Sequence, residues 1–218
     1  MSLAIFDLDN TLLRGDSDVA WGHFLAEKGV VNATIYTAEH DRFYAEYEAG
    51  KLDIYEFLAF QLRPLAEHDQ DTLKKLRTEF MNTKIAPLIT APAQKLVEKH
   101  RRQGHTLLIV TATNSFITQP IAQAFGVPVL IATEPEIVDG RFTGRVNGVP
   151  SFREGKVRLL RRWLVNHDEN LVDSWFYSDS HNDLPLLEIV DHPVAVNPDR
   201  ELLRVAIQRD WPIVDLAD

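Results

Sequence analysis

The second half of the chain alternates between helix and strand patterns, and this alternation restricts the fold more than any other feature of the sequence. The segment TAPAQKLVEKHRRQG, with Pro92 near its start and Gly104 past its end, is typical of a helix and precedes the apolar run TLLIVT. Similar pairs continue through residues 115 to 209. One interruption, EIVDGRFTG, places Asp139 and Gly140 between β-prone residues and predicts a hairpin. Repeated helix and strand units predict a doubly wound α/β core with a parallel sheet.

The first third of the chain has a different character. Residues 3 to 6, LAIF, form a short apolar run that is typical of a strand buried on both faces. Residues 18 to 29 then predict a helix, and no strand pattern follows until about residue 85. Three further helices are expected there: residues 33 to 48, a segment that begins at Asp53 with Glu56 as a capping box, and residues 72 to 83.

These patterns predict two domains. A Rossmann-like catalytic core would comprise residues 1 to 14 and 86 to 218. Residues 15 to 85 would form a small all-helical cap domain inserted after the first strand.

Composition excludes several classes of function. Twenty-three basic residues against 32 acidic residues give a formal net charge of −9, which argues against nucleic acid or an anionic membrane as a partner. The absence of cysteine excludes disulfides, thiolate metal sites and cysteine nucleophiles. No apolar run approaches the ~20 residues that a spanning helix needs, and no signal-type segment precedes the first strand pattern. We therefore expect a soluble, cytoplasmic protein that acts on a small molecule.

Unusual side chains gather at the ends of three predicted strands. Asp7 and Asp9 follow LAIF, Thr111 follows LLIV, and Asp179 follows WFYS. In an open α/β sheet these positions meet at the ligand-binding edge. Lys156 lies on the predicted helix that precedes the strand WFYS, and it is the natural cation to join these side chains.

Such an edge would be crowded with negative charge. Asp7, Asp9, Asp179 and Asp183 would each raise the pKa of the others if they lay a few ångströms apart. A hard divalent cation relieves this repulsion, and Mg²⁺ prefers carboxylate ligands. The four acids are therefore the candidate magnesium site.

Four motifs together resemble those of the haloacid dehalogenase superfamily. They are DLDNT after the first strand, Thr111, the downstream Lys156, and SDSHNDLP. Their order and spacing match along essentially the whole chain. The helical insertion is similar to the cap of the phosphoserine phosphatase-like subgroup, which includes histidinol-phosphate phosphatase relatives. The residues between Thr111 and Lys156 are filled by strand, helix and hairpin patterns, so the family's other cap position is expected to be empty.

The resemblance implies an Mg²⁺-dependent phosphatase with an aspartyl-phosphate intermediate. Asp7 would be the nucleophile, and Asp9 would protonate the leaving alkoxide and later take a proton from water. Thr111 and Lys156 would hold the phosphoryl oxygens. Mg²⁺ would be held by the Asp7 carboxylate, the Asp9 carbonyl and Asp179. A further acid, Asp183, would orient a metal-bound water or the lysine.

The family also implies roles in substrate binding. Backbone N–H groups at Ala112 and Thr113 would assist at the phosphoryl group, and Asn182 would be a neighbouring polar support. Asp16 stands nine positions after the nucleophile, where the phosphoserine enzymes place the acid that meets the substrate ammonium group. Histidinol phosphate is narrowly favoured, then phosphoserine, then choline or ethanolamine phosphate. The phosphoserine enzymes bind the substrate carboxylate with a cap arginine. Arg42 and Arg63 are available for this role, and the family pattern does not favour one over the other.

Some residues depart from the family pattern. Ser178 and Ser180, followed by His181, stand where many relatives have glycines around the fourth motif. Ala112 and Thr113 replace two glycines that the phosphoserine enzymes usually carry, which weakens the transfer of their substrate preference. Two alternatives stay open at this point: a phosphoryl transferase on the same fold, and a non-catalytic phosphoacceptor or binding protein.

Overall fold

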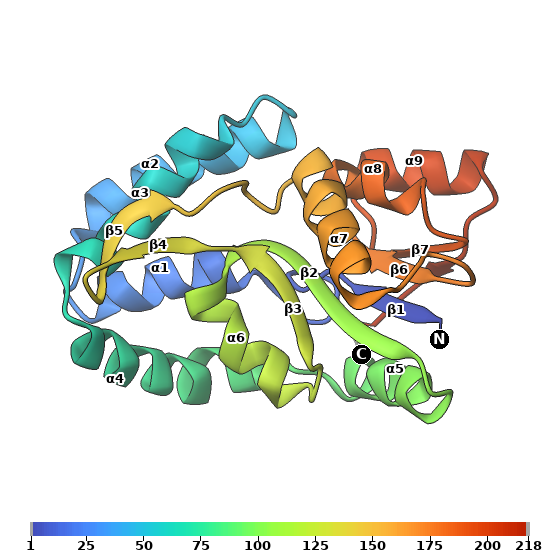
Figure 1. Ribbon diagram of the computed structural model, residues 1–218. Coiled ribbons are helices and arrows are strands. Elements are labelled where there is room, and N and C mark those ends of the chain that lie inside the picture. Colours follow the sequence, from blue (N-terminus) through green and yellow to red (C-terminus); the bar gives the residue numbers. More distant parts are fainter. Residues whose placement is uncertain (1, 217–218) are drawn as a thin grey trace.

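The computed structural model describes residues 2 to 216 and is built on a parallel sheet with helices on both faces (Figure 1). The sheet has six strands in the order β3-β2-β1-β6-β7-β8, and every neighbouring pair is parallel. The strands are β1 (Leu3–Phe6), β2 (Thr106–Asn114), β3 (Val129–Thr133), β6 (Trp175–Ser178), β7 (His192–Val196) and β8 (Ile213–Val214). The order reverses its direction at β1, which is the switch point of a doubly wound sheet. The predicted fold class is confirmed.

Strand β1 is buried on both faces, as its apolar sequence predicts. Ala4 and Phe6 belong to the apolar cluster on one face, and Leu3 and Ile5 belong to the cluster on the other. Alternate side chains of a strand point to opposite faces, so four consecutive apolar residues serve both layers. Helices α5 (Ala91–Arg102) and α6 (Ser115–Ala124) contribute to the first cluster, and α7 (Glu154–His167), α8 (Leu184–Leu187) and α9 (Arg200–Gln208) contribute to the second.

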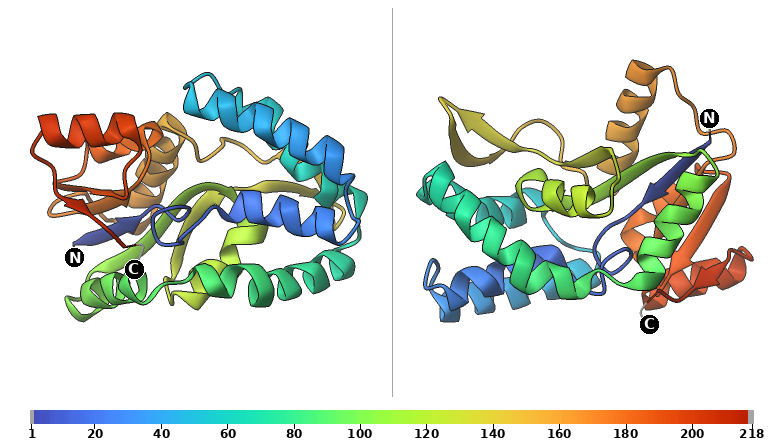
Figure 2. Two further views of the ribbon diagram at one scale, coloured as in Figure 1. Left: turned by 180° about the vertical axis from the view of Figure 1, so that it is seen from behind. Right: turned by 90° about the horizontal axis from the view of Figure 1, so that it is seen from below.

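The segment after β1 is helical, as predicted, and its helices lie together beyond one end of the sheet (Figures 1 and 2). It contains α1 (Ser17–Glu27), α2 (Ala33–Glu48), α3 (Ile54–Glu67) and α4 (Gln70–Phe80). Each helix begins after an Asp or Asn whose side chain accepts backbone N–H groups of the first turn. The predicted cap residue Asp53 does so at Tyr55 and Glu56. Below, these four helices are called the cap.

The two connections between cap and core lie side by side. After α4 the chain continues through a π-helical turn, Met81–Ile85, and a 3₁₀ turn, Ala86–Leu88. Leu13 then forms an isolated antiparallel bridge with Ile89, and the Arg14 N–H donates to the Leu88 carbonyl at 2.9 Å. The predicted helix over residues 72 to 83 thus ends in a wider turn close to the point where the cap begins.

The predicted hairpin forms, but it leaves the main sheet and packs on the cap. Strands β4 (Pro135–Val138) and β5 (Arg141–Val146) are joined by Asp139 and Gly140, both with positive φ. Strand β5 lies along α3 (Figure 1). A Cβ at Gly144 would stand 3.4 Å from the Ala66 Cβ, and Gln70 Nε2 donates to the Gly140 carbonyl at 2.8 Å. Residues outside the predicted boundaries of 15 to 85 therefore contact the cap.

Two details differ from the expected elements. Strand β2 does not end at Thr111 but continues to Asn114, with an irregular register after Val110. Asn114 then caps α6 by accepting the Ile117 N–H, so the strand passes directly into the helix. The short strand β8 was not expected, because two apolar residues give no period to recognise. None of the helices within residues 2 to 216 combines the length and apolar character that crossing a membrane requires.

Candidate active site

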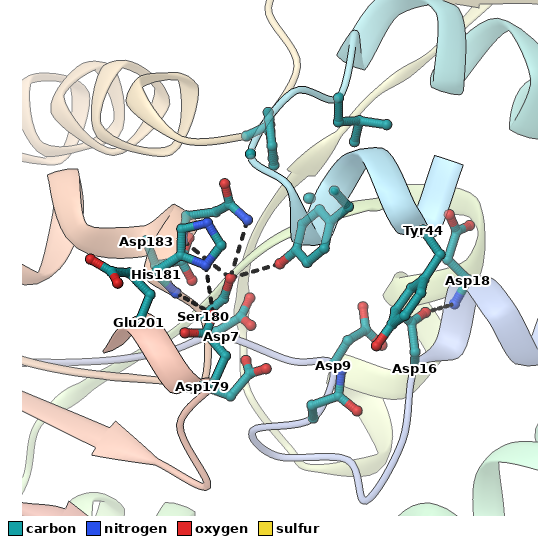
Figure 3. Close-up of a pocket in the computed structure, with 18 of the residues that line it drawn as sticks. Asp7, Asp9, Asp16, Asp18, Tyr44, Asp179, Ser180, His181, Asp183 and Glu201 are labelled. Carbon is teal, nitrogen blue, oxygen red and sulfur yellow. Dashed lines mark hydrogen bonds and ion pairs between the residues drawn. The ribbon is translucent and has the colours of Figure 1, made fainter. Parts of the chain in front are cut away.

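A cavity of about 1060 Å³ lies between the cap and the carboxyl ends of the strands. Figure 3 shows the acids that line it, with Asp7 and Asp179 near the core and Asp16 at the start of α1. The predicted site residues all line this cavity: Asp7, Asp9, Asp16, Thr111, Ala112, Thr113, Lys156, Asp179, Asn182 and Asp183. The fold thus brings together residues from four separate parts of the sequence.

Lys156 is the central cation of the site. Its Nζ lies 2.8 Å from Asp7 Oδ1 and 2.8 Å from Asp183 Oδ2, and the residue is 4% exposed. Ser178 Oγ also donates to Asp183 Oδ2, at 2.7 Å. Burial lowers the pKa of Lys156, but the two carboxylates outweigh burial and raise the pKa above its usual value. The lysine therefore stays charged and fixes one oxygen of Asp7.

Asp7 and Asp179 carry more negative charge than their partners neutralise. Burial raises the pKa of Asp7 to about 7, with Lys156 opposing and Asp183 adding to the rise. Burial, followed by the charges of Asp7 and Asp183, raises the pKa of Asp179 well above its usual value. Asp179 Oδ1 accepts from Thr11 Oγ1 at 3.0 Å. This excess of buried carboxylate is the charge that a cation would balance.

Asp9 is held jointly by the cap and the core. Its Oδ1 accepts from the Ser17 N–H at 2.7 Å, in the first turn of α1, and its Oδ2 accepts from Thr113 Oγ1 at 2.8 Å. Burial and then the charge of Asp16 raise the pKa of Asp9 to about 6. A carboxyl group with such a pKa is suited to give and take a proton near neutral pH.

The donor set fits a hard divalent cation with few side-chain ligands. Within residues 2 to 216, no three acidic or histidine side chains converge in an arrangement that would hold a metal by themselves. The contacts explain this, because Lys156 bonds Asp7 and Asp183 while the Asp9 carboxylate is directed to Ser17 and Thr113. Asp7 and Asp179 remain as oxygen donors with raised pKa values. Oxygen-only donors of this kind suit Mg²⁺.

Thr111 has a hydroxyl group that is ready to donate. Thr111 Oγ1 accepts from the Thr113 N–H at 3.2 Å, and the residue is 1% exposed. A hydroxyl that already accepts one bond keeps its own hydrogen for another partner. The Thr113 N–H, for which the family resemblance implies a contact with the phosphoryl group, donates to this hydroxyl in the structure. The contacts of Thr113 are thus with Thr111 and Asp9.

Two further contacts join the core to the cap and to the connection between α2 and α3. The Tyr47 hydroxyl lies 2.7 Å from Ser180 Oγ, and Arg153 Nη2 donates to the Gly50 carbonyl at 3.0 Å. Arg153 Nε also donates to Asn182 Oδ1 at 2.7 Å, so Asn182 is oriented by an arginine. Arg153 has a φ of 50°, an uncommon value for a side chain of its size. Sequence reasoning missed these contacts, because Tyr47 and Arg153 lie in ordinary helical and basic segments.

Neither cap arginine considered for a substrate carboxylate lines the described part of the cavity. Arg42 is bonded to Glu39, Glu46 and Glu56 on the cap surface. Arg63 lies 3.8 Å from Glu67 at an exposed position. The described lining residues therefore include no free cap arginine for a carboxylate.

Comparisons with known proteins show the family of the chain. The profile of the haloacid dehalogenase-like hydrolases matches residues 4 to 188. A histidinol-phosphatase of Neisseria meningitidis is 44% identical over 218 residues, which covers 98% of each chain. A phosphoserine phosphatase of Mycobacterium tuberculosis is 32% identical over 97% of this chain and 70% of its own.

Solved structures give the same result for the fold. A Bordetella pertussis protein of unknown function has a TM-score of 0.93 and 46% identity, covering 99% of this chain and 98% of its own. A substrate-bound phosphoserine phosphatase shares the fold with a TM-score of 0.72 at 18% identity, covering 100% and 93%. Fold and site define a hydrolase with a doubly wound core, a helical cap and an acidic centre. The chain belongs to the haloacid dehalogenase-like hydrolases, and it is an enzyme of the phosphatase class within that family.

Proposed function

We propose that the chain is an Mg²⁺-dependent phosphomonoester hydrolase that forms an aspartyl-phosphate on Asp7. The observation that carries this proposal is the buried Lys156, which holds Asp7 Oδ1 and leaves Oδ2 for attack. Asp179 and the carbonyl of Asp9 would hold Mg²⁺ together with Asp7. When bound, Mg²⁺ neutralises part of the charge on the acids and on the phosphoryl oxygens.

In the first step, Asp7 Oδ2 forms a bond to phosphorus and the ester P–O bond breaks. Protonated Asp9 gives its proton to the leaving alkoxide, which departs as an alcohol. Thr111 donates to a phosphoryl oxygen, and Lys156 supplies positive charge beside it.

In the second step, the Asp9 carboxylate takes a proton from water. The water oxygen forms a bond to phosphorus, and the bond between phosphorus and Asp7 breaks. Inorganic phosphate leaves, and both aspartates return to their starting states. Contacts of the Asp9 carboxylate with Ser17 and Thr113 keep it at the reacting group.

The proposed substrate is a small amino-bearing phosphate ester, with histidinol phosphate ahead of phosphoserine. Asp16 lines the cavity, and in this proposal its carboxylate receives the ammonium group of the substrate. Neither Arg42 nor Arg63 of the cap lines the cavity, and the arginines that do, Arg200 and Arg204, belong to α9 of the core. The proposal therefore favours a substrate without a carboxylate, because no described cap arginine is available to bind one. The N. meningitidis relative, named histidinol-phosphatase, supports the same order.

Release of inorganic phosphate tests this function. Wild-type protein with Mg²⁺ is expected to hydrolyse p-nitrophenyl phosphate, and EDTA is expected to abolish the reaction. Among amine esters, kcat/KM should be highest for histidinol phosphate and should fall for the Asp16→Asn variant. A preference for an amine-free sugar phosphate would overturn the substrate, and full activity in metal-free buffer would overturn the mechanism. Transfer to an acceptor alcohol without phosphate release would identify a transferase.

A further inference from the structure

The carboxylate of Asp18 lies at the cavity without the partner that a buried charge requires. Asp18 is 7% exposed and lines the same cavity as the catalytic acids (Figure 3). Its Oδ2 accepts from Gln61 Nε2 at 2.8 Å, whereas its Oδ1 is buried and has no hydrogen-bond partner. A buried carboxylate oxygen with no donor is costly. A ligand donor that approaches the carboxylate from the cavity would remove this cost.

Three cap helices hold Asp18 in place. Gln61 on α3 is 2% exposed, and its Oε1 accepts from the hydroxyl of Tyr36 on α2. Tyr36 in turn occupies the space above Gly22 of α1, where a Cβ would lie 2.1 Å from its ring. The side chain of Gln61 is therefore oriented so that its N–H group reaches Oδ2 of Asp18. An exposed acid that merely begins a helix has no such support.

Asp18 is the second of two acids at this end of the cavity. Asp16 uses Oδ1 to cap α1, accepting the N–H groups of Asp18 and Val19 at 2.8 and 2.9 Å. Burial raises the pKa of both acids, and the charge of Asp16 adds to the rise at Asp18. The buried Lys156 is bonded to Asp7 and to Asp183. Within residues 2 to 216, no basic side chain is among the hydrogen-bond partners of Asp16 or Asp18.

The neighbouring lining suits a flat ring. Tyr44 and Phe57 line the same cavity. Aromatic side chains stack on planar heterocycles, so this wall can hold a nitrogen-containing ring while a carboxylate receives its N–H. A single ammonium group would neutralise one of the two acids and leave the other uncompensated.

We propose that Asp18 is a second substrate-binding carboxylate, which receives the N–H of a nitrogen heterocycle in an ester whose ammonium group meets Asp16. This inference rests on the proposed function and narrows its substrate class. The substrate would carry a phosphate, a primary ammonium group and a second nitrogen function such as an imidazole, and no carboxylate. Specificity then comes from two carboxylates at the end of the cavity formed by α1.

The test compares three esters with the Asp18→Asn variant. Asparagine keeps the shape and can still accept from Gln61, but it removes the charge and puts an N–H₂ group in the place of the unpartnered Oδ1. For histidinol phosphate, kcat/KM should fall by about 10- to 100-fold, the loss expected for a hydrogen bond to a charged group. For ethanolamine phosphate, which lacks the ring, the loss should stay below about threefold, and p-nitrophenyl phosphate should change by less than about twofold. Glu27→Gln, at an exposed acid on the same helix, is the matched control.

A binding measurement separates this inference from the proposed function. Histidinol, which has no phosphate, is titrated calorimetrically into metal-free wild-type and Asp18→Asn protein, and a loss of affinity of at least tenfold is expected for the variant.

Equal losses of kcat/KM for all three esters would show that Asp18 is structural and would overturn the inference. Unchanged kinetics and unchanged histidinol binding would also overturn it. A wild-type protein that hydrolyses no ester would overturn the proposed function, and the calorimetric comparison would then decide the role of Asp18. If the Asp18→Asn variant does not fold, Gln61→Glu takes its place, because it puts a negative charge beside Oδ2 of Asp18. This variant should lose kcat/KM for histidinol phosphate and keep it for the other two esters.

Discussion

Lys156 Nζ donates to Asp7 Oδ1 at 2.8 Å, and both side chains are almost completely buried. In the proposed mechanism, this bond leaves the other oxygen of Asp7 for attack on phosphorus and keeps a positive charge beside the reacting group. Asp183, held by Ser178, fixes the lysine from the other side. The proposed nucleophile, Asp7, is therefore oriented by a chain of contacts that begins at the end of β6.

Replacing Lys156 by methionine should damage both catalysis and folding. Turnover should fall by ~10²-fold or more, because a charge next to the transferred group is lost. The free energy of unfolding at neutral pH should fall by about 3 kcal/mol, since Asp7 and Asp183 lose their buried partner. Phosphate release and urea unfolding measure the two effects. The control, Lys95→Met at an exposed position on α5, should change neither turnover nor the free energy of unfolding. Wild-type turnover by the Lys156→Met variant would exclude a role for Lys156 in catalysis.

Substitutions of the two aspartates should separate their roles. Asp7→Asn should abolish covalent phosphorylation, because the nucleophilic carboxylate is gone. Asp9→Asn should still form some intermediate but turn over ~10²-fold or more slowly, because both proton transfers suffer. Mass spectrometry of acid-quenched protein detects the aspartyl-phosphate, and steady-state assays give turnover. Near-normal turnover by Asp7→Asn would refute the assigned nucleophile.

Much of the core could be predicted from the sequence, because strong local signals marked it. LAIF indicated a strand buried on both faces, and Asp53 marked the beginning of a helix. Strand ends in a parallel sheet converge, so Asp7, Thr111 and Asp179 were expected to lie near one another. These conclusions depended on residue type and spacing alone.

Contacts between distant side chains could not be predicted in this way. No local pattern shows that Tyr47 meets Ser180 or that β5 packs on α3. Nor does a pattern distinguish Asp18 from any acid in a first helical turn, a position that the helix dipole favours. Its missing partner and its bond to Gln61 become visible only when three helices are placed together.

Loss of the Tyr47 hydroxyl should weaken closure of the cap. Tyr47→Phe removes the bond to Ser180, so KM should rise by about two- to tenfold while kcat changes less, as expected for about 1 kcal/mol. Steady-state kinetics with p-nitrophenyl phosphate measure this change. Tyr55→Phe is the control, since Tyr55 is 61% exposed on the cap. Equal effects of the two substitutions would contradict a specific role for the bond.

The cap should move as a unit when the site is filled. We predict hinges near residues 13 to 15 and 85 to 88. These two segments are joined by the bond from the Arg14 N–H to the Leu88 carbonyl, so residues 16 to 84 can rotate about one short double connection. Because β5 packs on α3, the hairpin over residues 135 to 146 should move with them. Crystal structures with and without a phosphate analogue measure the displacement. Identical cap positions in lattices that leave the cap free would argue against gating.

His100 should make stability sensitive to acid. Its side chain is fully buried between the Tyr177 hydroxyl and His105 Nδ1, each at 2.8 Å, and burial, aided by His105 and Lys99, lowers its pKa to about 4. The unfolded chain, with a histidine pKa near 6.5, binds more protons between these values. The contribution of His100 to stability is therefore complete above about pH 6.5 and is lost progressively as the pH falls toward 4. The buried acids titrate in the opposite sense, so the informative quantity is the difference between wild type and His100→Gln in urea unfolding at several pH values. The His100→Gln variant should lose less stability on acidification than wild type. The control is His167→Gln, at the exposed end of α7, which should behave as wild type. Parallel profiles for wild type and His100→Gln would show that His100 does not titrate in this range.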